Sequence, residues 1–583
     1  MRKRDDRDIS STLAGSLRAL RRRPSVLLGL LVFALVWLLW TWRIQRGVDM
    51  SDESLYVAVP MRFALGDLPF LDDRSSFQGA GIMTAPLVFL YRLVVGSSDG
   101  VVLFMRVMFV SFLTGIGVLI ARSVRGWIAG GTAIACGALA CFFVPYYIAQ
   151  LSYNTMGGGL AMLASFESLR VARSATAKEA ARHALICGLA AAGSGLAYPT
   201  LGALFPVHLV MLLVFGRAHL GAWRVALRYF AGAAILGAYV GLFVIRAGFG
   251  SLRLTLDFIA AWGPSLTNSA KTVIEGVEAL KGDWFTTLTI ALALTILAMR
   301  FRPAVIALAI AVPFLAAASG SDIYWSLRLW SCLALFAPLF AVLVEDRRMA
   351  FKVLMIVWLP GMIAGFVTGY SSGNGARSCG IGAFTCVVAG SVLAARAIEE
   401  SLGSLRSVLS GAGMVAPLAL LYALTVRVFD KDSIYRDQPF AALTTRVGAG
   451  PFKGLWTTAV RRELVETMHR DVVAHSQGGG FVLFLPDMSS AYLSTNARPA
   501  IPEIWVTNNH GRAAIEVGIL MERLPRITAV FIRSCPGAND WSDCKPYLLE
   551  PKNPLHAAVN EHFEEDFRRF DYAVMRRRVE SPP

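Results

Sequence analysis

The feature that most constrains this chain is a series of apolar runs, each about 20 residues long, that recur from Val26 to Val426. A helix of that length crosses a hydrocarbon core of about 30 Å. Of the 583 residues, 55% are hydrophobic and 16% are charged, with a mean hydropathy of +0.55. A soluble domain carries charge on about a quarter of its residues. The sequence therefore predicts a polytopic α-helical membrane protein.

The charges that flank these runs predict a topology. The first span lies at about 26–43 and follows the basic stretch "RRRPS". When thirteen spans are counted from there, every even-numbered span ends at a basic loop, as the positive-inside rule requires. The net charge of +16 is explained by these loops, so binding of nucleic acid is not expected. The N-terminus is predicted to be cytoplasmic and the C-terminus to lie outside. The Ala, Gly and Arg usage is typical of a GC-rich bacterial genome, and the expected location is a bacterial inner (plasma) membrane.

After Arg427 the apolar runs stop. Helix-like segments then alternate with short β-rich ones such as "GFVLFLP" and "ITAVFIRS", which predicts an extracytoplasmic α/β domain. Cys535 and Cys544 lie there in a short polar loop and would form a disulfide outside the cytoplasm, whereas a zinc site lacks a second pair of ligands. The predicted regions are a basic cytoplasmic N-terminus (1–25), a transmembrane domain (26–427) with a first outer loop (44–99) and a long outer loop (247–284), and the α/β domain (428–583).

Two adjacent carboxylates, Asp52 and Glu53, follow the first span in the stretch "VDMSDESLY". Acidic residues in the first turn of a helix complement the free backbone N–H groups and the helix dipole. The alternative is functional: Asp52 would be a general base held at the outer membrane surface. Both interpretations fit these residues.

The stretch "DESLYVAVPMRFALGDLPFLDD" resembles the start of the GT-C lipid-linked sugar transferases, and especially the aminoarabinose lipid A transferases and protein O-mannosyltransferases. The predicted layout of thirteen spans with an outer C-terminal domain is similar too. The resemblance implies that Asp52 is the catalytic aspartate, with Glu53 beside it. It also implies that the sugar donor is a polyprenyl phosphate embedded in the membrane lipid. The acceptor would be a hydroxyl on a glycan, lipid or protein. It leaves a divalent metal ion open.

Transfer from a lipid phosphate needs cations or N–H donors to stabilise the departing phosphate. Arg74, Arg328 and Arg377 lie at the predicted outer boundary, where each either binds phosphate or reaches toward lipid headgroups. Tyr324 is a membrane-interface aromatic or a substrate contact, and Ser152 and Asn154 either cap a helix or bind a sugar. His208, inside the sixth predicted span, is expected to make an interhelical hydrogen bond.

The sequence therefore predicts a membrane glycosyltransferase that moves a sugar from a polyprenyl-phosphate carrier to an outer acceptor hydroxyl, in one inverting displacement. The first alternative is a transporter or lipid flippase, for which ionisable groups near the middle of the membrane are expected. A third interpretation is a non-catalytic assembly or sensor protein. No Walker A loop, H-E-x-x-H or G-x-S-x-G motif is present, so ATP hydrolysis and soluble hydrolase chemistry are not indicated.

Overall fold

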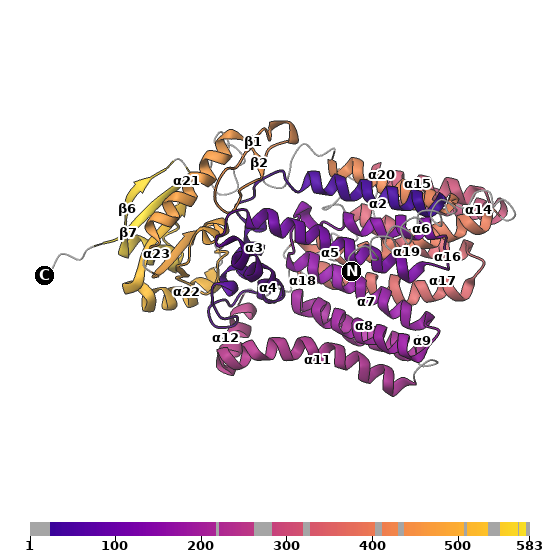
Figure 1. The fold of residues 1–583 in the computed structure, drawn as a ribbon, viewed down its shortest axis with the longest axis horizontal. Helices are drawn as coiled ribbons and strands as arrows, with labels where there is room; N and C mark the ends of the chain where they lie inside the picture. Colours follow the sequence, from indigo (N-terminus) through magenta and orange to yellow (C-terminus); the bar gives the residue numbers. More distant parts are fainter. Residues whose placement is uncertain are drawn as a thin grey trace, which may run out of the picture.

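A computed structural model shows a long helical bundle with a smaller α/β domain at one end (Figure 1). Tyr324, Cys535 and Cys544 lie outside the described residues, so the hypotheses about them stay predictions. The structure describes residues 24–216, 221–261, 283–318, 327–372, 374–402, 411–429, 437–477, 479–506, 510–534, 549–569 and 571–578.

A helical segment lies at each position where the sequence predicts a membrane span. Several of these segments are interrupted by a 3-10 or π turn, which shortens the continuous α-helix. In chain order the segments are α2 (Pro24–Arg43), α5 (Val101–Val124), α6 (Gly130–Ala138) with η1 (Leu139–Phe142), α7 (Tyr153–Arg173), α8 (Ala177–Ala197), η3 (Pro199–Ala203) with α9 (Leu204–Phe215), α11 (Ala222–Ala247), α14 (Asp283–Arg300), α15 (Ala304–Ala318), α16 (Leu327–Leu343), α17 (Arg347–Val353) with η4 (Leu354–Trp358) and α18 (Leu359–Ser371), α19 (Gly380–Ser401), and α20 (Val415–Phe429).

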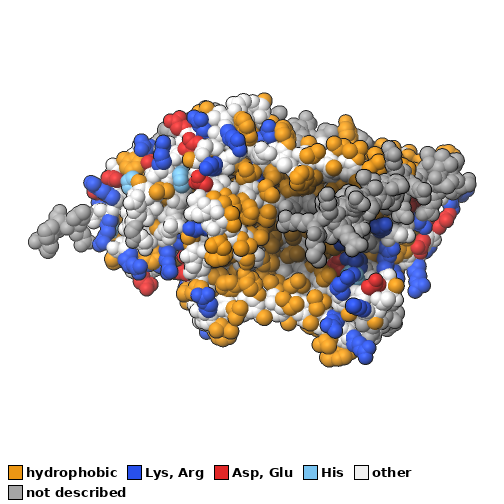
Figure 2. Space-filling view, viewed as in Figure 1, with side chains coloured by type: hydrophobic (Ala, Val, Ile, Leu, Met, Phe, Trp, Pro, Cys, Tyr) orange, Lys and Arg blue, Asp and Glu red, His pale blue; other side chains and the backbone are white. Residues whose placement is uncertain are grey.

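Six helical stretches among the described residues are long and apolar enough to cross a membrane: Pro24–Arg43, Gln78–Val95, Val101–Val124, Ala222–Ala247, Arg347–Ser371 and Arg377–Ser401. Hydrophobic side chains cover the middle of the molecular face in Figure 2, and charged side chains gather toward its two ends. Such a band suits a lipid bilayer. The chain is a multi-pass helical membrane protein, while the number of thirteen spans and their orientation stay predictions.

Small residues allow helices of the bundle to approach closely. A Cβ at Gly188 of α8 would lie 1.9 Å from the backbone oxygen of Tyr229 on α11, and a Cβ at Gly232 would lie 2.0 Å from that of Leu185. Only glycine fits at these two crossings, because any side chain would force the backbones apart. Membrane helices commonly pack through such small residues, since lipid supplies no hydrophobic drive for their association.

The first outer loop contains two helices, α3 (Asp52–Ala64) and α4 (Gln78–Val95). Both lie between the bundle and the C-terminal domain (Figure 1). α3 ends before Gly66, whose φ of 103° turns the chain back, and α4 ends at Gly96 in the left-handed conformation. The loop therefore forms a folded layer beneath the C-terminal domain.

Residues 437–578 form an α/β domain around a five-stranded sheet of order β4-β3-β5-β7-β6. β3 is parallel to β4 and β5, and β7 is antiparallel to β5 and β6. A separate two-stranded sheet pairs β1 with β2. The elements are β1 (Thr445–Arg446), β2 (Trp456–Thr457), α21 (Ala459–His475), β3 (Phe481–Leu485), η9 (Ser489–Ser494), β4 (Arg498–Pro499), α22 (His510–Arg523), β5 (Ile527–Arg533), α23 (Pro554–His562), β6 (Phe563–Arg568) and β7 (Tyr572–Arg577).

Backbone hydrogen bonds join this domain to the first outer loop. The backbone N of Trp456 donates to the oxygen of Gln45 at 2.7 Å, and the N of Gly47 donates back to Trp456 at 2.8 Å. Further along, the N of Arg74 donates to the oxygen of Pro502 at 2.9 Å. The start and the middle of the loop are thus both fixed to the domain.

Candidate functional site

Asp49, which the sequence analysis did not single out, organises the turn that leads into α3. It is buried, and its two carboxylate oxygens accept the backbone N–H groups of Ser51 at 2.9 Å and Glu53 at 2.7 Å. Its backbone oxygen accepts the Ser54 hydroxyl at 2.5 Å. A carboxylate that accepts the first N–H groups of a helix fixes where the helix begins. Asp49 therefore positions Asp52 and Glu53.

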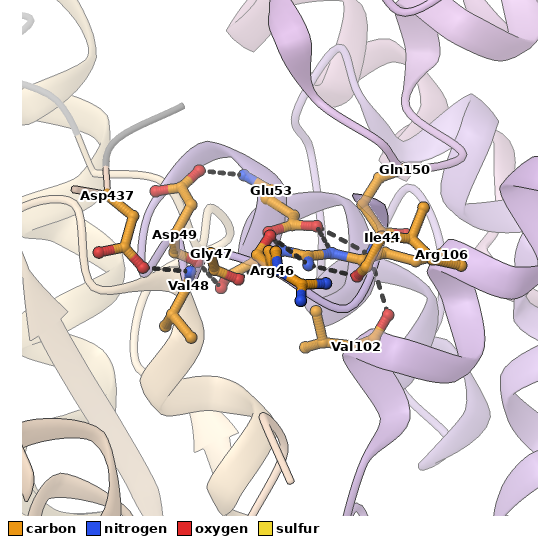
Figure 3. A network of polar contacts seen from close by, with 11 residues as sticks. Ile44, Arg46, Gly47, Val48, Asp49, Glu53, Val102, Arg106, Gln150 and Asp437 are labelled. Carbon is orange, nitrogen blue, oxygen red and sulfur yellow. Dashed lines mark hydrogen bonds and ion pairs between the residues drawn. The ribbon is translucent and has the colours of Figure 1, made fainter. Parts of the chain in front are cut away.

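Glu53 is held in a buried ion pair with Arg106 of α5 (Figure 3). The two Glu53 oxygens accept from Arg106 Nε at 2.5 Å and Nη2 at 2.6 Å. Arg106 also donates to three backbone oxygens, those of Ile44, Arg46 and Gly47, at 2.6, 3.1 and 2.9 Å. These five bonds use all the N–H donors of the guanidinium.

Gln150, in the loop before α7, completes this Glu53–Arg106 network. Its amide nitrogen donates to a Glu53 oxygen at 3.2 Å and to the backbone oxygen of Val102 at 3.1 Å. Both Glu53 oxygens are thus occupied by donors. The contacts of Glu53 join α3 to α5 and to the loop before α7, and the expectation that it shares the catalytic role stays a prediction.

Asp52 opens α3, next to Glu53. The Ser51 hydroxyl lies 3.5 Å from an Asp52 carboxylate oxygen. Tyr56 lies four residues further on the same face of the helix, and its ring centroid is 5.7 Å from that of Tyr153, at the start of α7. Asp52 is half-buried, and the N-terminus of α3 favours its negative charge. Glu53 is thus bound to α5, while Asp52 lies one turn before the tyrosine that packs against α7.

Three tyrosines, Tyr146, Tyr153 and Tyr198, come together at this end of the bundle; we call them the tyrosine cluster. The rings of Tyr153 and Tyr198 have centroids 5.2 Å apart. Tyr146 shares a hydrogen bond between its hydroxyl and that of Ser378, and it lies near the other two tyrosines. The three residues come from the loop before α7, from α7 itself and from the end of α8. Sequence reasoning missed them because such tyrosines are also typical of a membrane-interface belt.

The loop that carries Tyr146 has an unusual backbone. Tyr146 and Tyr147 both adopt positive φ angles, of 57° and 60°. Side chains other than glycine adopt this conformation at a cost of order 1–3 kcal/mol, and such residues cluster at functional sites. The loop ends at Ser152, whose hydroxyl accepts the N–H of Thr155 at 3.1 Å and caps α7. The predicted capping of this helix therefore belongs to Ser152.

Arg377 and Asn154 join the tyrosine cluster. Arg377 lies in the turn η5 (Gly375–Cys379), is exposed, and lines a small cavity with Pro145 and Tyr146. Asn154 follows Tyr153 and is buried, and its side-chain oxygen has no hydrogen-bond partner among the described residues. Asn154 and Arg377, predicted from two distant segments, therefore lie at the tyrosine cluster, and Asp52 lies one turn before Tyr56, which packs against Tyr153.

The other predicted residues lie elsewhere or are not described. Arg74 is held against the C-terminal domain through Pro502 and lies near Arg523. Arg328 is in α16, but its side chain is outside the described part of the structure. His208 is buried, and neither ring nitrogen has a partner among the described residues, so the predicted interhelical hydrogen bond is wrong there.

The donors near Asp52 do not fit a divalent metal ion. Such ions need several oxygen ligands, but Asp49 accepts backbone N–H groups on both oxygens and Glu53 is bound by Arg106. In the described ranges there is no group of three or more His, Cys, Asp or Glu side chains arranged to hold a metal.

No protein-family model and no curated protein matches this chain. Solved structures are similar. The oligosaccharyltransferase of Archaeoglobus fulgidus, tethered to an acceptor peptide, has 11% sequence identity and a TM-score of 0.46, over 87% of this chain and 69% of that one. ArnT from Cupriavidus metallidurans, bound to undecaprenyl phosphate, has 15% identity and a TM-score of 0.43, over 96% and 99%.

Proposed function

We propose that this chain is an integral membrane glycosyltransferase of the GT-C kind, which moves a sugar from a polyprenyl-phosphate carrier to an acceptor hydroxyl on the outer side of a bacterial inner membrane. One observation carries the proposal. Of the two carboxylates in the motif, Glu53 is bound on both oxygens by Arg106, whereas half-buried Asp52 lies at the N-terminus of α3, one turn before Tyr56, whose ring centroid is 5.7 Å from that of Tyr153.

In the proposed reaction Asp52 is the general base. The acceptor oxygen attacks the anomeric carbon of the donor sugar, and its proton passes to the Asp52 carboxylate. The bond between that carbon and the carrier phosphate oxygen breaks, and the lipid phosphate leaves with the electron pair. A single displacement of this type inverts the anomeric configuration. Asp49 and the Glu53–Arg106 network hold the base in place.

The departing phosphate needs positive charge or hydrogen-bond donors. Arg377 is the arginine we assign to this role, because it lies beside Tyr146 in the cluster that Asp52 faces. Tyrosine hydroxyls are ordinarily protonated near neutral pH and can donate as well. Asn154, with its buried oxygen, is assigned to a donor-sugar hydroxyl. Arg74, which contacts the C-terminal domain, and Arg328 are not assigned.

The test is transfer by the full-length protein, reconstituted in lipid vesicles with a panel of undecaprenyl-phosphate sugars and bacterial envelope acceptors. We expect Asp52→Asn to lower the transfer rate by about 10²–10⁴-fold, the usual contribution of a general base. Asp257→Asn is the matched control, because Asp257 is exposed on α12 (Phe249–Ala260). Unaltered transfer by a folded Asp52→Asn protein would remove Asp52 from the chemistry.

The same experiment separates the transporter or flippase alternative. A carrier that only moves a lipid-linked sugar across the bilayer would make the labelled donor accessible on the second leaflet without forming a new glycosidic bond. Donor movement without a product, equal in the wild-type and Asp52→Asn proteins, would favour that alternative. A sensor or assembly protein would show neither activity.

A further inference from the structure

A polar cavity lies where the end of α3, the loop after α4 and the C-terminal domain meet; we call it the junction cavity. Its volume is about 490 Å³, within the range of about 300–1,000 Å³ that is usual for ligand sites. Its lining includes Met61, Arg92, Asp99, His469, Ser494 and Asn496. It is separate from the site at Asp52, which opens the other end of α3.

The walls of the junction cavity are fixed by hydrogen bonds. His469 Nδ1 lies 2.9 Å from the Ser494 hydroxyl, and Asp99 accepts the backbone N–H of Gly450 at 3.2 Å. Arg62, whose Nε lies 2.8 Å from Asp67, donates to the backbone oxygen of Thr495 at 3.3 Å. A site whose groups are already held requires little ordering when a ligand binds.

The lining of the cavity carries few charges. It includes one arginine, Arg92, and one carboxylate, Asp99, and the Asp99 carboxylate is paired with Lys453 at 3.3 Å. Burial lowers the pKa of His469, so its imidazole is neutral near pH 7. The hydroxyl of Ser494 and the amide of Asn496 each supply both donors and acceptors. Phosphate groups are usually bound by clustered cations, whereas this mixture suits sugar hydroxyls.

The position of the cavity relates it to Asp52 and to the membrane. Met61 follows Asp52 by nine residues on α3, which is roughly 14 Å along a helix. On the other side, Leu93 and Val94 follow Arg92 at the end of α4 and are 71% and 84% exposed. Because the end of this helix is apolar and exposed, we expect the neighbouring edge of the cavity to lie at the lipid surface.

We infer that the junction cavity binds a hydroxyl-rich glycan segment of the acceptor, roughly 14 Å from the hydroxyl that reacts. That this glycan belongs to the acceptor rests on the proposed function. Binding at a distance from the reacting atoms supplies energy that positions the acceptor hydroxyl beside Asp52. The glycan can be free or carried on a membrane lipid, and the experiment distinguishes the two.

The experiment measures binding and does not depend on transfer. Full-length Asp52→Asn protein in nanodiscs is mixed with fluorescent synthetic oligosaccharides of bacterial envelope type, two to four sugars long, each free and attached to a lipid tail. We expect at least one to bind, and Asn496→Leu to weaken it by about tenfold, the effect of losing one or two hydrogen bonds. Asn496 is exposed, so this variant is expected to fold.

Asn560→Leu, an exposed position on α23, is the matched control and should leave binding unchanged. Tighter binding of the lipid-attached form would identify a lipid-borne acceptor, and equal binding a soluble one. Binding by no member of the panel, equal binding by Asn496→Leu, or displacement by inorganic phosphate would each overturn the inference. Glycan binding that needs Asn496, in a protein with no transfer activity in any form, would support the glycan site and contradict the proposed function.

Discussion

Buried charges fix the first outer loop at two places, and they are compensated differently. At the start of the loop, one carboxylate and one arginine form the Glu53–Arg106 network, and every guanidinium N–H is used. In the middle of the loop, three buried carboxyl groups surround a single guanidinium, that of Arg512. We call this second group the shared-arginine cluster; its carboxyl groups are Asp73, Glu503 and Glu516.

The shared-arginine cluster joins three parts of the protein. Arg512 Nη1 donates to the two Glu503 oxygens at 2.7 and 2.6 Å, and its guanidinium stacks 4.4 Å from the ring centroid of Phe258 on α12. Asp73 belongs to the first outer loop, while Glu503, Arg512 and Glu516 belong to the C-terminal domain. One cation cannot neutralise three carboxylates, so protons must supply the remaining compensation.

Burial raises the pKa of all three carboxyl groups, to about 6 for Asp73, about 7 for Glu503 and about 8 for Glu516. Neighbouring carboxylates raise these pKa values further, since Asp67 acts on Asp73, Asp73 on Glu503 and Glu503 on Glu516. Arg512 lowers each pKa. The start of the loop is therefore held by a buried ion pair. In the middle of the loop, the stability of the contact between Asp73 and the C-terminal domain depends on pH.

The largest effect on stability is expected at the Glu53–Arg106 network. Arg106→Ala leaves Glu53 buried without its cation, which should lower the free energy of unfolding by about 3–5 kcal/mol. Thermal unfolding in detergent measures this. The control is Arg576→Ala, because the Arg576–Glu564 pair is exposed and such pairs contribute about 0–1 kcal/mol. Equal destabilisation by the two variants would contradict the difference between a buried and an exposed pair.

An intermediate effect is expected from pH at the shared-arginine cluster. Because the folded-state pKa of Glu516 is raised from 4.5 to about 8, the folded protein binds more protons than the unfolded protein between these values. Stability should therefore be highest at low pH, fall as the pH rises through this window, and level off above about pH 8. Unfolding temperatures from pH 5 to 9 measure it.

Glu516→Gln should flatten that pH dependence, because the amide stays neutral throughout. Glu522→Gln, an exposed position on the same helix, should leave the slope unchanged. A wild-type protein whose stability rises with pH in this range, or a Glu516→Gln protein with the wild-type slope, would show that this cluster is not compensated by protons.

The smallest effect on stability is expected at Gln150, the amide that completes the Glu53–Arg106 network. Gln150→Leu removes two hydrogen bonds but leaves the Arg106 pair intact, so it should lower the free energy of unfolding by about 1 kcal/mol. Gln45→Leu is the control, because Gln45 is partly buried and its amide donates to the backbone oxygen of Thr41, four residues earlier at the end of α2. A loss from Gln150→Leu as large as that from Arg106→Ala would mean that the amide, rather than the ion pair, anchors the loop.

The sequence was sufficient where local pattern decides the outcome. Hydropathy located the apolar helices, because about 20 consecutive apolar residues have few stable alternatives to a helix in or near a membrane. The motif around Asp52 placed a helix N-terminus directly after the first span, and α3 begins there. The β-rich segment "GFVLFLP" contains strand β3.

The sequence was insufficient where distant residues decide the outcome. Nothing near Glu53 indicates that its partner is Arg106, 53 residues further along, because that pairing depends on how α3 packs against α5. Asp73 and Arg512 are still further apart. A signal did exist for Arg106, since an arginine inside an apolar run needs a buried partner or an aqueous path.

The central claim is that Asp52 faces the place where the carrier phosphate and its sugar bind. The most direct measurement is a cryo-electron microscopy structure of full-length Asp52→Asn protein in nanodiscs with an undecaprenyl-phosphate sugar. We expect density for the phosphate beside Arg377 and the tyrosine cluster, with the anomeric carbon next to residue 52. Carrier density at another position, with residue 52 out of reach of the sugar, would contradict the account.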